Sequence, residues 1–250
     1  MKIRNCFVSC LLTFCLTLTF VQPFAAQADE FIDLLVRAEI VKAQVFDAQE
    51  DITLVDVRSH YEYQQNHIKG AISKSYEDII KLETLPYYKD QALILYCGCP
   101  HHLSGLSARH LQKLGHQNVK ILDEGYFYWK DAMGYPISSQ KTSSTDLPLT
   151  SFDILGVLHN SKQLPIAQTN IFLIHKKTRQ IEATRTDEIG QFVMQMHFYG
   201  VDADDAFEIV VDGKVVKNAH FSELTERLYV ISEGGFSDDS IARLESSEAY

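Results

Sequence analysis

Short apolar runs alternate with helical patterns between Ile52 and Gly134, and this alternation restricts the fold more than any other feature of the sequence. The runs are rich in aliphatic side chains, which is typical of strands covered on both faces. Strands that alternate with helices form a parallel sheet with helices on both faces, so we expect an α/β domain. The expected strands are Ile52–Val57, Ala92–Tyr96 and Val119–Leu122, and the expected helices are Tyr61–Asn66, Glu77–Leu82, Ser104–Leu114 and Tyr126–Met133.

The pattern changes after Ile137. The stretch 138–150 is rich in Ser and Thr and predicts a linker. Residues 151–232 then follow a period of two, with a hairpin signal at Asp212-Gly213, and predict a small antiparallel β-sandwich as a second domain. Residues 233–250 are polar and predict a loose tail. The expected strands are Phe152–Leu158, Asn170–His175, Ile181–Thr186, Gln191–Phe198, Phe207–Val211, Lys214–Asn218 and Arg227–Ser232.

The first 28 residues have the plan of a secretory signal peptide. Two basic residues, Lys2 and Arg4, precede the apolar stretch Cys6–Phe20, and the small-residue site Ala26-Gln27-Ala28 follows. The apolar stretch is shorter than the roughly 20 residues of a spanning helix. We therefore expect cleavage after Ala28, no membrane span in the mature chain, and a periplasmic or secreted location.

The charge of the chain excludes some classes of partner. It carries 33 acidic and 23 basic residues, for a formal net charge of -10 at pH 7. Binding to nucleic acid or to an anionic membrane surface needs clustered Lys and Arg. We therefore expect no nucleic-acid partner.

Two cysteines remain after the predicted cleavage, because Cys6, Cys10 and Cys15 lie in the signal peptide. The remaining pair, Cys97 and Cys99, does not make a disulfide framework. A buried and chemically inert pair is one interpretation of these residues, since unmodified cysteine is often a small core hydrophobe.

Cys97 follows the expected strand Ala92–Tyr96 and precedes the expected helix that begins at Ser104. Open α/β sheets bind ligands at the carboxyl ends of their strands. The start of a helix also directs backbone N–H groups and the positive end of its dipole toward this place. Both features stabilise an anion, so the pattern predicts a lowered pKa for the Cys97 thiol and a site for a negatively charged sulfur species.

Five ordered motifs around Cys97 resemble those of a rhodanese domain. The resemblance covers Asp29–Ile137 and implies a rhodanese-like parallel five-stranded sheet with helices on both faces. The motifs are Asp56-Val57-Arg58, Glu62-Tyr63, His67-Ile68-Lys69-Gly70-Ala71, Tyr96-Cys97, and Leu122-Asp123-Glu124-Gly125 with Trp129 and Gly134-Tyr135-Pro136.

The resemblance implies a sulfurtransferase in which Cys97 accepts a sulfane sulfur as a persulfide and then transfers it to a thiol or another nucleophile. The expected partners are a sulfur donor and a thiol acceptor, and no cofactor or metal is implied. Residues that match the family as structural support are Asp56, Arg58, His67, Gly125 and Trp129. The loop whose backbone would hold the anion consists of Gly98, Cys99, His101, His102, Leu103 and Ser104.

The loop departs from the usual rhodanese pattern because it has no Lys or Arg before Arg109. Thiosulfate, a doubly charged donor, is therefore disfavoured against a small persulfide or the persulfide of a partner protein. Cysteine phosphatases on a related fold need an arginine six positions after the nucleophile, and this chain has Leu103 there. The sequence thus argues against phosphatase activity.

Two alternatives use further residues of the loop. Cys99 is placed to resolve a Cys97 persulfide or sulfenic acid, which would make the pair a thiol redox site. With His101 and His102 the two thiols also form a donor set that suits Cu(I) or Zn(II). A simpler role for the histidines is that one of them tunes the sulfur site while the other faces solvent.

Short motifs in the second domain resemble the β-sandwich modules related to the carboxypeptidase regulatory domain. They are Gly156-Val157, Leu164-Pro165-Ile166-Ala167 and Thr186–Phe192. The resemblance implies a non-catalytic module that positions or docks a partner protein.

Overall fold

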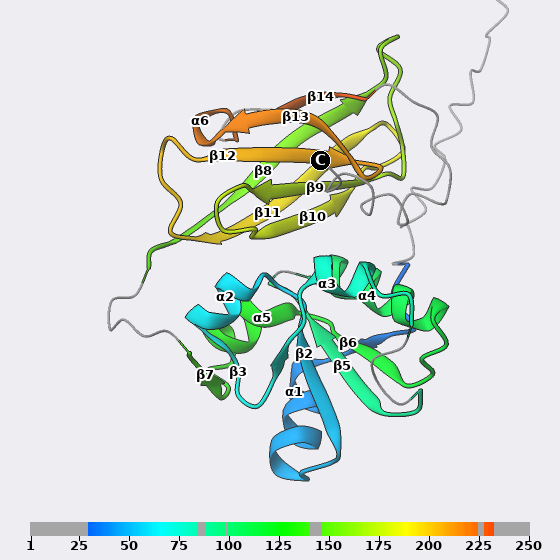
Figure 1. Ribbon diagram of the computed structural model, residues 1–250, viewed down its shortest axis with the longest axis vertical. Helices are drawn as coiled ribbons and strands as arrows, with labels where there is room; N and C mark the ends of the chain where they lie inside the picture. Colours follow the sequence, from blue (N-terminus) through cyan, green and yellow to red (C-terminus); the bar gives the residue numbers. More distant parts are fainter. Residues whose placement is uncertain (1–29, 85–88, 99, 141–146, 225–227, 233–250) are drawn as a thin grey trace, which may run out of the picture. The chain divides into compact units, whose positions relative to one another are not determined.

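A computed structural model describes residues 30–84, 89–98, 100–140, 147–224 and 228–232 (Figure 1). The described residues from Phe31 onward belong to one compact unit. The expected signal peptide, the C-terminal tail and Cys99 lie outside the described residues. In the described part of the chain, no helix is long and apolar enough to cross a membrane.

A five-stranded parallel sheet forms the first half of the structure, with the strand order β1-β6-β5-β2-β4 (Figure 1). The predicted α/β class with a five-stranded parallel sheet is therefore confirmed. A separate antiparallel pair consists of β3 and β7. The strands are β1 (Leu35–Val36), β2 (Ile52–Asp56), β3 (His67–Ile68), β4 (Ile72–Ser73), β5 (Ala92–Tyr96), β6 (Val119–Leu122) and β7 (Ile137–Ser138).

Helices cover both faces of this sheet because apolar side chains point to both faces. Along β5, Leu93 and Leu95 join the core beneath α3 and α4, whereas Ile94 and Tyr96 join the opposite core, which also contains residues of α1 and α5. The helices are α1 (Ala38–Lys42), α2 (His60–Gln65), α3 (Tyr76–Ile80), α4 (His102–Lys113) and α5 (Gly125–Phe127), with π-helical turns η1 (Ala43–Asp47) and η2 (Tyr128–Ala132).

The second half of the chain forms two further sheets. Their strand orders are β10-β9-β12-β13 and β11-β8-β14. Side chains of both sheets, among them Leu173 and Phe207 of the first and Met196 and Leu158 of the second, pack in one shared core. The elements are β8 (Leu149–His159), β9 (Asn170–His175), β10 (Ile181–Arg185), β11 (Gln191–Tyr199), β12 (Ala206–Val211), β13 (Lys214–His220), α6 (Phe221–Leu224) and β14 (Leu228–Ile231).

Several expectations for these elements were wrong in detail. Strand β14 runs parallel to β8, so the second half is not wholly antiparallel. Strands β13 and β14 belong to different sheets, so they do not form an antiparallel pair with each other. Helix α4 begins at His102 rather than Ser104, since the amide of Gly105 already donates a helical hydrogen bond to the His101 carbonyl, at 2.7 Å. The expected linker contributes its ends to β7 and β8.

Side chains of β9, β10 and β12 join the apolar core that α3 and α4 form on one face of the parallel sheet. Phe172 of β9 stacks on Tyr76 of α3 at 5.5 Å between ring centroids. Ile174, Ile181 and Val210 belong to the same apolar cluster as Cys97 and the buried residues of α4. Cys97 thus lies where the two halves of the chain share a core.

Candidate active site around Cys97

Cys97 is the first residue after β5 and lies at the carboxyl end of the parallel sheet. Its side chain is buried, and its Sγ atom lies 3.5 Å from Ser104 Oγ. The backbone groups of Leu103 and Ser104 also hydrogen-bond the sulfur, which favours the thiolate. The first turn of α4 therefore faces the thiol.

The turn at Gly125 holds the start of the loop in place. The amide of Tyr126 donates to the Cys97 carbonyl at 2.9 Å, and the amide of Phe127 donates to the Gly98 carbonyl at 3.2 Å. Gly125 has φ = 77°, a left-handed conformation that glycine adopts without strain. A Cβ atom on Gly98 would lie only 3.0 Å from the Phe127 ring, so this position has little room for a side chain.

The expected lowering of the Cys97 pKa is wrong. Burial in an apolar core raises the pKa of the thiol to about 11, because the thiolate loses its hydration. The hydrogen bonds from Ser104 and Leu103 offset only part of this effect, and the nearby carboxyl of Glu182 raises the pKa further. The start of α4 lies at the thiol as expected, but desolvation raises the pKa of Cys97 by more than the hydrogen bonds of this helix lower it.

The two loop histidines have different surroundings, and neither is fully exposed. His101 adopts φ = 27°, and its Nδ1 lies 2.8 Å from the carbonyl oxygen of Asp123. His102 Nε2 lies 3.1 Å from Asn170 Oδ1, and its side chain lines the cavity next to Cys97. Of the two, His102 is therefore the histidine that lies at the cysteine.

A cavity of about 310 Å³ opens beside the thiol. This volume falls at the lower end of the range for small-molecule sites. Among the described residues, its lining contains Glu182 and His102 as titratable side chains beside the thiol, and neither Lys nor Arg. The lining residues are Cys97, Pro100, His102, Leu103, Glu182, Ala183, Thr184, Val193 and Gln195.

Glu182 is a titratable lining residue that the sequence did not indicate. It lies on β10 and is buried, and its Oε1 atom lies 4.0 Å from Nδ1 of His197 on β11. Burial raises its pKa well above the ordinary value, and the charge of Glu62 adds to this shift. The sequence of β10 does not predict that Glu182 is buried, because a glutamate between Ile181 and Ala183 is typical of the solvent-facing side of a strand.

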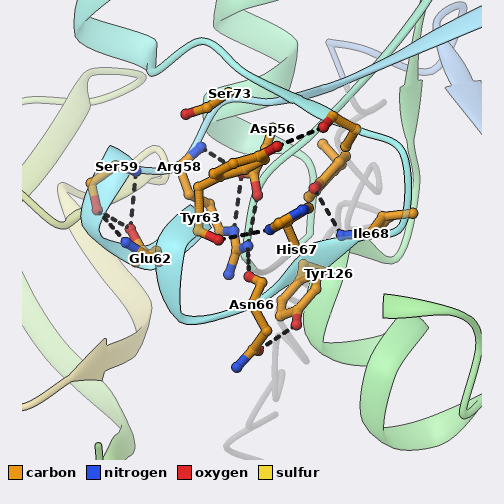
Figure 2. Close-up of polar contacts among 12 residues, drawn as sticks. Asp56, Arg58, Ser59, Glu62, Tyr63, Asn66, His67, Ile68, Ser73 and Tyr126 are labelled. Carbon is orange, nitrogen blue, oxygen red and sulfur yellow. Dashed lines mark hydrogen bonds and ion pairs between the residues drawn. The ribbon is translucent and has the colours of Figure 1, made fainter. Parts of the chain in front are cut away.

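Arg58 is the centre of a buried polar network next to the site (Figure 2). Its Nε and Nη2 atoms donate to the two carboxylate oxygens of Asp56, at 3.0 and 2.7 Å. Nη2 also donates to the Asn66 carbonyl at 2.7 Å, and the guanidinium lies 3.9 Å from the centroid of the Tyr126 ring. The network fixes the loop after β2 to the turn that holds Cys97.

Glu62 at the start of α2 belongs to the same buried region (Figure 2). It forms a capping box with Ser59, whose amide donates to Glu62 Oε2 at 3.1 Å. Burial raises the pKa of Glu62 to about 7, although Arg58 and Ser59 favour its charged form. A second carboxyl near Glu182 is thus easily protonated.

The other expected support residues make packing contacts. His67 stacks on Tyr63 at 3.8 Å between ring centroids (Figure 2). Trp129 is fully buried and donates from Nε1 to the Pro136 carbonyl at 3.2 Å. None of Asp56, Arg58, His67, Gly125 and Trp129 lines the cavity next to Cys97.

The nearest basic residue along the loop and helix is not part of the cavity lining. Arg109 pairs with Asp33, with Nη1 3.0 Å from Oδ2. Leu103 is buried at the position where a cysteine phosphatase needs its arginine. The described lining therefore offers no guanidinium for a phosphate or for thiosulfate.

The alternatives that use Cys99 stay predictions, because this residue lies outside the described part of the chain. Among the residues that the structure describes, no group of three or more Cys, His, Asp or Glu side chains is arranged to hold a metal ion.

Residues 38–132 match the family model of the rhodanese-like domain. This part of the chain has a rhodanese-like fold. The match contains Cys97 and four of the motifs that surround it in the sequence.

Individual relatives share only part of the chain. An HTH-type transcriptional regulator of Mycobacterium tuberculosis is 34% identical over 106 residues, and the match spans 42% of this chain and 44% of the regulator. The solution structure of a rhodanese-like domain from an Anabaena protein is 22% identical, with a TM-score of 0.40 over 45% of this chain and 87% of that domain. A thiosulfate sulfurtransferase from Pseudomonas aeruginosa is 22% identical, with a TM-score of 0.37 over 42% and 20% of the two chains.

Proposed function

We propose that this protein is an exported rhodanese-like sulfurtransferase or sulfur carrier. Cys97 accepts a sulfane sulfur as a persulfide and transfers it to a thiol or another nucleophile. The observation that carries the proposal is the position of Cys97 in the rhodanese-like domain, after β5 and against the first turn of α4. The proposed location is the periplasm or the outside of the cell, from the signal-peptide pattern of residues 1–28.

The transfer consists of two exchanges of sulfur. The Cys97 sulfur attacks the outer sulfur of a donor R–S–SH, the S–S bond of the donor breaks, and R–SH leaves with the proton of the thiol. An acceptor thiol then attacks the outer sulfur of the Cys97 persulfide and regenerates Cys97. No external oxidant or reductant is needed, because each step breaks one S–S bond and forms another.

The cavity favours a small donor without multiple negative charges. Its volume of about 310 Å³ suits a small molecule, and the lining that the structure describes has an acidic residue and no Lys or Arg. A small persulfide fits this chemistry better than thiosulfate. We further propose that the second half of the chain, which resembles carboxypeptidase-regulatory-like modules, is a non-catalytic module that positions the site or docks a partner protein.

The proposal is tested by multiple-turnover transfer from a small persulfide donor to a thiol acceptor. We expect wild type and the matched control Cys99→Ser to transfer sulfur, and Cys97→Ser to fall to the rate without protein. Transfer that survives Cys97→Ser would show that another group carries the sulfur. If both single variants are inactive, the Cys97 and Cys99 pair acts together, as in the redox alternative.

A further inference from the structure

Glu182 is a buried carboxyl that shares the cavity of the Cys97 thiol. Its residue is 6% exposed, and its carboxyl oxygen Oε1 lies 3.4 Å from the point where a Cβ on Gly98 would be. The carboxyl is thus next to the residue that follows Cys97. Both side chains line the same cavity of about 310 Å³. A substrate in this cavity would therefore lie against the thiol and the carboxyl together.

The charges around Glu182 come from three elements. Glu62 at the start of α2 disfavours ionisation of Glu182, and Arg58 favours it. Arg58 already makes a bidentate ion pair with Asp56. On β11, the backbone of His197 hydrogen-bonds Glu182, and the pKa of the His197 imidazole is lowered by burial. Burial raises the pKa of Glu182 well above its ordinary value and so favours the protonated carboxyl, which has one donor and one acceptor oxygen, although His197 Nδ1 lies 4.0 Å from Oε1.

We propose that the Glu182 carboxyl relays the proton of the Cys97 thiol to the thiol that departs during sulfur transfer. The inference rests on the proposed function for the nature of the donor. As the Cys97 sulfur attacks the outer sulfur of R–S–SH, one carboxyl oxygen takes the thiol proton. The other oxygen gives its own proton to the sulfur of R, whose bond to the outer sulfur breaks. The products are the Cys97 persulfide, R–SH and an unchanged carboxyl.

The relay explains how a buried thiol with a raised pKa can react near neutral pH. Without it, the reaction depends on the small fraction of Cys97 that is ionised, and the rate follows this fraction as the pH rises. With it, no thiolate forms as a separate species. A positioned acid–base group of this kind contributes roughly 100-fold or more to a rate.

The test uses bis(2-hydroxyethyl) disulfide, an uncharged probe whose S–S bond breaks in the same way and whose leaving group also needs a proton. The parent protein is Cys99→Ser, so that Cys97 is the only thiol of the mature chain. Mixed-disulfide formation is followed by intact mass between about pH 6.5 and 8.5. The matched control is Glu188→Gln, an exposed glutamate in the turn between β10 and β11.

We expect the exchange rate of the parent and of Glu188→Gln to change less than about threefold over this range. Glu182→Gln is expected to be on the order of 100-fold slower at pH 7, with a rate that rises about tenfold per pH unit. The relay is overturned if Glu182→Gln and the parent share the same rate and the same pH dependence. Glu182→Asp, which keeps a carboxyl, is expected to be slower than the parent but to keep the flat profile; a tenfold rise per pH unit in this variant contradicts the relay even if Glu182→Gln does not fold.

The failure of this inference is distinguishable from the failure of the proposed function. Disulfide exchange does not require a persulfide, so a flat profile in a protein that never accepts sulfane sulfur rejects the sulfurtransferase proposal alone. Persulfide formation at Cys97 with the same pH dependence in the parent and in Glu182→Gln rejects the proton relay alone.

Discussion

The surroundings of the Cys97 thiol combine two opposite influences. The Ser104 hydroxyl and the first amides of α4 favour the thiolate, as the sequence position of the cysteine indicates. The apolar cluster that includes Leu103 and Ile181 removes water from the same atom, and this effect is larger. The thiol is therefore neutral at physiological pH, and its chemistry depends on the groups that exchange protons with it.

Because the Cys97 thiol is neutral at physiological pH, we expect slow alkylation of Cys97. In Cys99→Ser protein at about pH 8, we expect iodoacetamide to react about 100-fold more slowly with the folded chain than with the chain in urea. The reason is that a thiol with a pKa of about 11 is far less ionised than one near the ordinary value of about 8.5. The measurement is a quenched time course by intact mass. Because burial also slows access, the pH profile is decisive: a plateau of the folded-state rate below about pH 9 would contradict the raised pKa.

At the scale of secondary structure, the parallel sheet could be predicted because its central strands are apolar on both faces. Strands β1 and β4 could not, since each has two residues and leaves no period to detect. The burial of Glu182 could not be predicted either, because the alternating pattern of Ile181–Arg185 predicts that one face of the strand is exposed to water. In the structure both faces are covered at the start of β10, one by the cluster that contains Ile181 and the other, at Glu182, by Gly98 and His197.

The turn at Gly125 gives a prediction at this scale. Gly125→Ala is expected to lower the free energy of unfolding by about 1–2 kcal/mol, because alanine is strained at φ = 77°. It should also slow reactions of Cys97, since the amides of Tyr126 and Phe127 hold the loop. The control is Gly134→Ala, where φ is 59° and a Cβ would meet nothing within 4 Å. Urea unfolding and disulfide exchange measure the two effects. Equal losses of Cys97 reactivity in both variants would contradict the positioning role of this turn.

At the scale of the whole molecule, the site depends on residues far apart in the sequence. The rhodanese-like domain supplies the thiol and the first turn of α4, whereas β10 and β11 supply the opposite wall of the cavity. The sequence predicted both halves from local patterns. It could not predict that they share one core, because no local pattern states which surface of one half covers which surface of the other.

The buried carboxyls of both halves predict that stability falls as the pH rises. The pKa of Glu62 is raised to about 7 in the folded chain and is about 4.3 in an unfolded one, so the folded state binds the proton more tightly. The contribution of this proton to the free energy of unfolding is fully present below about pH 4.3. It is lost as the pH approaches 7, at up to about 1.4 kcal/mol per pH unit. Glu182 acts in the same direction.

Glu62→Gln tests this dependence, because glutamine preserves the capping box and does not titrate. We expect its urea midpoint to change less between about pH 5 and pH 7 than that of wild type. Glu188→Gln, which alters an exposed glutamate, should behave like wild type. The same loss of stability in wild type and in Glu62→Gln would show that Glu62 titrates normally.

Intact-mass spectrometry shows whether Cys97 carries sulfur, because a persulfide adds the mass of one sulfur atom. Protein without residues 1–28 is purified without reductant and measured before and after a small persulfide donor, as wild type, Cys97→Ser and Cys99→Ser. From the proposed role of Cys97 as the sulfur carrier we expect a gain of one sulfur atom in wild type and in Cys99→Ser, and none in Cys97→Ser. No gain in wild type, a gain that survives Cys97→Ser, or a loss of two hydrogens in wild type without sulfur uptake would contradict it.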